Sequence, residues 1–170
     1  KSFQVSETAV VNKVELYLKK VSTPSNLVVR IVSNSGGSPG TTTLASGSLS
    51  ASLVSTTYGW VNVPFSSNPE LTAGVTYWIV IDGSTNSSRY YIIGANADGY
   101  LGGTGKIGQY SGTWSNTSPS GADGFFKLYL GGLTGLISGI TVGTAGVGDA
   151  YAHTVNNSTI AGTYYCQTGS

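Results

Sequence analysis

The sequence predicts an all-β protein: an antiparallel β-sandwich or jelly roll, followed by a glycine-rich extended β segment. Three observations lead to this prediction. Short runs of β-branched and aromatic residues are separated by turn residues throughout residues 1–130. No window has an apolar stripe with helical spacing, and the many glycines would weaken a helix. Hydrophobic residues make up 39% of the 170 residues, enough for a core, although only 9% are charged.

The first expected strand covers residues 13–20, where apolar and polar side chains alternate as in a strand buried on one face. The second covers residues 27–32, which are rich in β-branched side chains. A cluster of serine, glycine and proline at residues 33–40 then predicts a turn.

A third strand is expected at residues 59–65, where Trp60 and Asn62 alternate with apolar residues and share a solvent face. Pro64 cannot donate to a ladder, so it indicates an edge strand or a strand end. The most apolar run, residues 75–81, is expected to bury Trp78 in the core. The remaining expected strands are residues 89–94, 106–110 and 125–130.

The composition changes after Gly131, where glycine recurs every fourth residue as far as Gly143. In a strand this spacing keeps the glycines on one face and leaves Leu136, Ile140 and Val142 on the other. A membrane-spanning helix is not expected, because seven of the residues 128–148 are glycine. We therefore predict a sandwich domain at residues 1–130 and a strand-forming tail or linker at 131–170. Residues 136–144 are expected to form an assembly strand that docks between molecules.

The charge and the reactive residues exclude several functions. A net charge of +1 gives no basic surface for nucleic acid. The only histidine, His153, and the only cysteine, Cys166, lie in the glycine-rich tail, so neither a catalytic triad nor a transition-metal site is expected. Three aspartates precede glycine and are expected in turns: Asp82, Asp98 and Asp123. The sequence therefore predicts a protein that is not an enzyme and has no cofactor.

A calcium ion is a weaker alternative, because its oxygen ligands can come from loops. Asp82 with Asn86, or Asn96 with Asp98, would supply such ligands. Their spacing matches no defined calcium loop, so ordinary turn chemistry is favoured.

Aromatic and amide side chains gather in the loop-rich region 89–114. Aromatic rings stack on sugar rings, and amides bind hydroxyl groups, so this set predicts a glycan platform. Its residues are Tyr90, Tyr100, Tyr110, Trp114, Asn96 and Gln109. The alternative is that these aromatics cover long loops on a charge-poor sandwich.

Four stretches follow one another in a familiar order: VNKVELYLKKVSTPSNLVVRIVSNSGGSPGTTTLASG, LTAGVTYWIVIDG, GQYSGTWSN and DGFFKLYLGG. Over about residues 3–130 this succession resembles the bacterial extracellular β-sandwiches called choice-of-anchor domains. The resemblance implies a module of a multidomain surface protein, similar to jelly-roll carbohydrate-binding and adhesin domains, with no shared catalytic motif. The tail resembles linker or stalk sequence of large exported proteins.

Two functions are therefore expected from different classes. The first is a structural or interaction module of a secreted or cell-surface protein, stalk or filament. Its partners would be a second copy or neighbouring domains of the same protein, joined by β-strand addition. The alternative is an adhesin-like carbohydrate-binding module, and a viral coat protein is a third, weaker interpretation. Four possible glycosylation sequons suit an exported chain: Asn86, Asn116, Asn156 and Asn157.

Overall fold

The fold is all-β, as the sequence predicts. The structure, a computed structural model, describes residues 1–83, 86–96, 102–118 and 120–131. Within these ranges the chain forms strands and a single 3₁₀ turn, Ala51–Leu53 (η1), and no α-helix. No helix in this part of the chain is long and apolar enough to cross a membrane.

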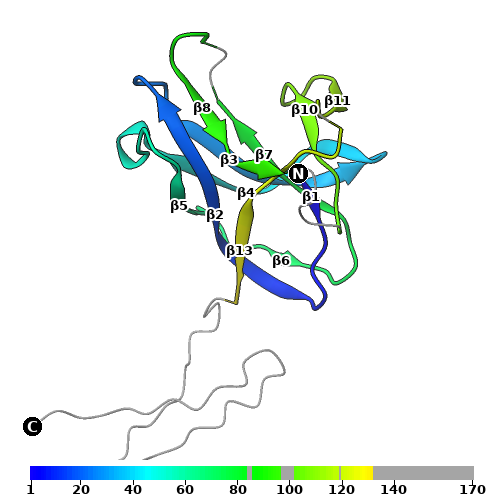
Figure 1. The fold of residues 1–170 in the computed structure, drawn as a ribbon. Coiled ribbons are helices and arrows are strands. Elements are labelled where there is room, and N and C mark those ends of the chain that lie inside the picture. The colour runs from blue at the N-terminus through cyan, green and yellow to red at the C-terminus, as the bar shows by residue number, and fades with distance from the viewer. Residues whose placement is uncertain (84–85, 97–101, 119, 132–170) are drawn as a thin grey trace, which may run out of the picture. The chain divides into compact units, whose positions relative to one another are not determined.

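The first of two large sheets has four antiparallel strands in the order β1-β7-β3-β4 (Figure 1). Its strands are β1 (Ser2–Phe3), β7 (Tyr77–Asp82), β3 (Leu27–Ser35) and β4 (Ser38–Leu49). The central pair, β3 and β7, consists mostly of β-branched and aromatic residues, which suits strands that are covered on both faces.

The second sheet is built around the longest strand, β2 (Ala9–Val21). On one edge of β2 lie β13 (Phe126–Leu130) and β8 (Tyr90–Ile93). On the other edge lie β5 (Gly59–Pro64) and β6 (Glu70–Leu71). All of these pairs are antiparallel. Strand β5 is an edge strand that ends at Pro64, as the proline predicts.

The hairpin between β3 and β4 differs from the expected turn at residues 33–40. The turn is confined to Gly36 and Gly37, whose φ angles of +56° and +79° favour glycine. Strand β3 therefore continues to Ser35, and β4 was not expected at all. Its sequence, SPGTTTLASGSL, resembles a loop in composition and is held in the sheet by its pairing with β3.

Two short antiparallel pairs complete the fold. Strand β9 (Ala95–Asn96) pairs with β12 (Asp123–Gly124), and β10 (Lys106–Gly108) pairs with β11 (Trp114–Asn116). The β10–β11 hairpin covers the outward side of the first sheet, because its Trp114 packs against side chains of that sheet.

Asp123 is not in a turn, so that prediction was wrong for this residue. It is buried in β12, and its carboxylate contacts the side-chain ammonium of Lys1 at 2.5 Å. The α-amino group of Lys1 donates to the carbonyl of Ile79, and burial lowers the pKa of this amino group to about 5. Because a buried charge is costly without a partner, the ion pair explains how Asp123 is accommodated.

The main core lies between the two sheets. Val14, Leu16 and Leu18 of β2 and Val29 and Ile31 of β3 belong to one buried cluster. A second, smaller cluster lies on the other side of the first sheet. It contains Trp78, Val32 and Val80, with Tyr110 and Trp114 packed against it. The expected burial of Trp78 is confirmed, since 1% of its surface is exposed.

Candidate binding face

The outward side of β5, β2 and β13 carries aromatic and charged side chains in register. Tyr17 lies opposite Trp60, and Glu15 lies between Asn62 and Lys127. Side chains alternate across a strand, so the apolar residues between these positions point into the core. We call this side of the sheet the aromatic face. Its residues are Lys13, Glu15, Tyr17, Lys19, Tyr58, Trp60, Asn62, Phe125, Lys127 and Tyr129.

Tyr17 is the centre of the aromatic face. Its ring stacks on Tyr58 with centroids 5.5 Å apart and an interplanar angle of 14°. It also meets Trp60 at 5.3 Å and the edge of Phe125 at 6.1 Å. Trp60 is 43% exposed and Tyr58 is 41% exposed. Large exposed apolar side chains that lie together mark a surface that binds something.

Three lysines place their ammonium groups over rings of this face. Lys127 Nζ lies 4.0 Å from the centroid of the Trp60 ring, and Lys13 Nζ lies 4.0 Å from that of Tyr129. Lys19 Nζ lies 4.7 Å from the ring centroid of Tyr58. At an exposed site each such cation–π contact favours this position of the side chain by about 0.5–1 kcal/mol.

Glu15 supplies the carboxylate of the aromatic face. Its oxygens lie 4.0 Å from Lys13 Nζ and 3.6 Å from Lys127 Nζ. A hydrogen bond to Glu15 raises the pKa of the Tyr129 hydroxyl, and desolvation adds to this effect. The face thus presents ring surfaces together with ammonium donors, a carboxylate acceptor and the Asn62 amide.

Two residues of the predicted glycan platform, Tyr110 and Trp114, lie on the other sheet. Both pack against the cluster that contains Trp78. The Tyr110 hydroxyl is 2.7 Å from the Thr43 hydroxyl, and the Arg30 guanidinium lies 4.2 Å from the centre of the Tyr110 ring. Tyr110 and Trp114 therefore pack on side chains of the first sheet, whereas the alternative interpretation of the sequence had them covering long loops.

The other residues of that predicted platform are dispersed. Tyr90 of β8 pairs with Val21 of β2, and alternation places it on the same side of the sheet as Tyr17. Asn96 is exposed in β9, and Gln109 is exposed in the turn after β10. Of the platform residues that the structure describes, Tyr90 alone lies on the sheet that carries the aromatic face. Several sequence-predicted residues lie outside the described ranges: Tyr100, Leu136, Ile140, Val142, Asp98, His153 and Cys166.

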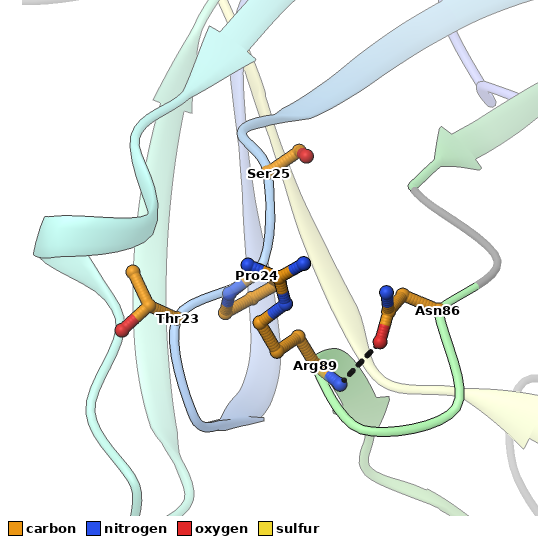
Figure 2. Close-up of a pocket in the computed structure, with 5 residues that line it drawn as sticks. All are labelled: Thr23, Pro24, Ser25, Asn86 and Arg89. Carbon is orange, nitrogen blue, oxygen red and sulfur yellow. Dashed lines mark hydrogen bonds between the residues drawn. The ribbon is translucent and has the colours of Figure 1, made fainter.

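A small pocket of about 190 Å³ has no residue of the aromatic face in its lining (Figure 2). It is lined by Thr23, Pro24, Ser25, Asn86 and Arg89. The Asn86 side-chain oxygen accepts from the backbone N–H groups of the two residues at the end of its turn, at 2.9 and 3.1 Å. None of the lining residues is a carboxylate, histidine or cysteine, so they provide no acid–base pair.

The calcium alternative gains no support from Asp82 and Asn86. Asp82 lies at the end of β7, where its carboxylate accepts from the Arg30 guanidinium at 2.8 Å. The Asn86 oxygen is already engaged by backbone N–H groups. Nowhere in the described part of the chain do three His, Cys, Asp or Glu side chains gather as metal ligands would.

The sequence signal for the aromatic face is alternation in three separate segments. Alternation correctly predicts strands at residues 13–20 and 59–65. Each segment alone, however, predicts only that one face of its own strand is polar. Residues 125–130 alternate in the same way, with Lys127 and Tyr129 on the outward side opposite Glu15 and Lys13. Only the pairing of β2 with both β5 and β13 brings these three sides together.

Comparisons of this chain with protein-family models, with curated proteins and with solved structures found no match.

Proposed function

We propose that this chain is a non-catalytic carbohydrate-binding module of an extracellular surface protein and that it binds glycan on the aromatic face. The observation that carries the proposal is the contiguous set of rings formed by Tyr17, Tyr58 and Trp60 on a sheet surface, two of which are more than 40% exposed. Exposed aromatic rings on a solvated sheet face are costly unless they serve a partner.

The geometry of the face suits a sugar chain. A twisted sheet surface is broad and shallow, so it supports an extended ligand better than a small molecule that needs enclosure. The exposed rings of Tyr58 and Trp60 would stack against the apolar faces of sugar rings, with the Tyr17 ring packed beside both. The Asn62 amide and the Glu15 carboxylate, one row along the strands, would exchange hydrogen bonds with sugar hydroxyls.

Binding without hydrolysis is supported by the carboxylates. Glycoside hydrolysis usually needs two carboxyl groups on either side of the scissile bond. Glu15 is the one carboxylate on the aromatic face, and it is held by Lys13 and Lys127. An extracellular location is supported by the low charge, the sequons and the resemblance to choice-of-anchor domains.

Replacing Trp60 by alanine is expected to weaken glycan binding about tenfold or more, a loss of about 1.4 kcal/mol. Insoluble and soluble polysaccharides would be screened with the full chain, and the affinity for the best ligand measured by calorimetry. Ile107→Ala is the control, because Ile107 is an exposed apolar residue of β10, away from the aromatic face. If Trp60→Ala binds as the parent chain does, this face is not the binding site.

Self-association is a second candidate function, favoured by β4. Among the described residues this edge strand forms a ladder only with β3. The Ser66 N–H donates to the Ser46 carbonyl and so covers part of the other edge, whereas Thr41, Thr42 and Thr43 are exposed along it. No charged residue occurs between Ile31 and Pro69. Natural edge strands are usually protected by charge or proline. Beyond Pro39, near its start, β4 has neither, so this part of the edge is suited to β-strand addition. The predicted assembly strand of another copy would be its occupant.

The full chain is then expected to sediment as an oligomer, whereas a chain ending at Gly132 sediments as a monomer. Thr42→Lys in the full chain should also give a monomer, because a charge on the edge opposes strand addition. Gln109→Lys adds the same charge to an exposed turn and should leave the oligomer intact. An unchanged sedimentation coefficient for Thr42→Lys, or a full chain that is monomeric at high concentration, would exclude assembly through β4.

A further inference from the structure

The aromatic face carries an excess of positive charge. It holds three lysines, Lys13, Lys19 and Lys127, and one carboxylate, Glu15, hence a formal charge of +2. The whole chain has a formal charge of only +1. Positive charge is therefore concentrated on the surface where the exposed rings lie, which favours a ligand of negative charge.

The ammonium groups of this face retain donors for a ligand. A charge-assisted hydrogen bond is about 2.7–2.9 Å long, whereas Glu15 lies 3.6 Å from Lys127 Nζ and 4.0 Å from Lys13 Nζ. An ammonium group has three N–H donors, and these longer contacts leave them available. The Lys127 side chain is also 49% exposed. A sugar that stacks on the ring surface under Lys127 displaces this ammonium group, whose donors then meet an acidic group of the same ligand.

The lysines lie at both ends of the aromatic centre. Lys13 and Lys19 are six residues apart on β2, which is about 20 Å at 3.3 Å per residue. Tyr17 lies between them, with Trp60 beside it. A single sugar cannot reach both ends, whereas a chain that runs along β2 meets ammonium groups at its ends and rings at its centre.

We infer that the aromatic face selects acidic polysaccharides, in which carboxylates or sulfates pair with Lys19, Lys13 and Lys127 while sugar rings stack on the exposed rings of Tyr58 and Trp60. This inference rests on the proposed glycan-binding function and adds the chemical class of the ligand. Carboxylates and sulfates share the anionic oxygens that ammonium groups bind, so the experiment has an arm for each.

Nucleic acid is the competing polyanion, since its bases also stack on aromatic rings. A continuous phosphate backbone would pass over Glu15, which lies between Lys13 and Lys127. Affinity for nucleic acid depends on neutralising many phosphates, and three lysines provide little of this. A glycan instead has hydroxyl groups between its acidic groups. The hydroxyls would donate to Glu15 while the acidic groups pair with Lys13 and Lys127 on either side of it.

The test uses the full chain and matched ligands in calorimetry at low and high salt. A long oligogalacturonate is compared with the same oligomer after its carboxyls are reduced to alcohols, and dextran sulfate is compared with dextran. We expect the acidic member of one pair to bind about tenfold or more tightly than its neutral counterpart. The pair that shows the difference identifies the acidic group. Binding should also weaken as salt is raised.

Substitutions at one end of the face and in its middle sharpen the test. Lys19→Gln and Lys127→Gln should each weaken binding of the acidic glycan about threefold to tenfold and reduce its salt dependence. The neutral counterpart, which forms no ion pair with these lysines, should lose less affinity than the acidic glycan in both variants. Lys106→Gln is the control, since Lys106 belongs to β10 and its ammonium donates to Asn116.

Three outcomes would overturn the inference. Equal binding of the acidic and neutral members of both pairs would show that the face binds glycan without selecting acid, which leaves the proposed function intact. Binding of no glycan at all would remove both. Binding of single-stranded poly(dT) as tightly as the acidic glycan, with the same loss in the lysine variants, would show general attraction to polyanions.

Discussion

Replacing Trp78 by alanine is expected to lower the free energy of unfolding by about 3–5 kcal/mol, the range for large aromatic residues removed from a core. Trp78 is 1% exposed and packs with Val32 and Val80 on the outward side of the first sheet. Its indole N–H donates to the Asn34 side-chain oxygen at 2.9 Å. The substitution would leave a cavity beneath Tyr110 and Trp114 and would deprive Asn34 of its donor.

Denaturant unfolding followed by circular dichroism would measure this change. Trp60→Ala is the control, because it removes the same side chain from an exposed position and should cost less than about 1 kcal/mol. A similar loss in both variants would mean that Trp78 is no more important to the core than a surface residue. Since Trp78 and the aromatic face lie on different sheets, glycan affinity should not change in the folded Trp78→Ala chain.

Replacing Gly47 by alanine is expected to cost about 1–3 kcal/mol, as overpacking usually does. Gly47 lies in β4 opposite Val29, and a methyl group at its Cα would overlap the carbonyl oxygen of Pro64. A carbonyl oxygen of the backbone cannot turn aside as a side chain can. The end of β5 would therefore have to move away from β4. This movement would strain the hydrogen bond that the Ser66 N–H, just after β5, donates to the Ser46 carbonyl of β4 at 2.8 Å.

Gly59→Ala is the matched control for this second substitution. Gly59 begins β5, and a methyl group there would meet no atom within 4 Å. The free energy of unfolding of the Gly59→Ala chain should differ from that of the parent chain by less than about 0.5 kcal/mol. Equal stability of the two alanine variants would show that β4 and β5 are not in close contact at Gly47.

The sequence predicts the strands whose side chains alternate, because alternation is a local property of the chain. Lys13–Lys20 shows it clearly, and the structure places β2 there. Strand β4 was not predicted, because its serines, threonines and glycines do not alternate with apolar residues. Its position is determined by pairing with β3. Burial is also predictable for Trp78, whose neighbours are β-branched.

The side of the molecule that an aromatic residue faces was harder to predict. Trp114 and Tyr110 were expected to be exposed with Tyr90, yet they cover Trp78 from a hairpin that folds back on β3 and β7. The local sequence cannot predict this contact, because Tyr110 and its partner Thr43 are far apart in the chain. For the same reason Tyr17, Trp60 and Phe125 appear in the sequence as three unrelated aromatics.

The pairing of β2 with the last described strand determines when the fold can be completed. Leu16 pairs with Phe126, so one edge of β2 has no β13 beside it until nearly all of the sandwich has been synthesised. Pairings this distant in sequence raise the contact order, which slows folding and prolongs exposure of unpaired strand edges. Lys127 and Tyr129 arrive with β13, so a nascent chain lacks part of its ligand surface until this final closure. Ligand binding would therefore report completed folding more faithfully than β-content does.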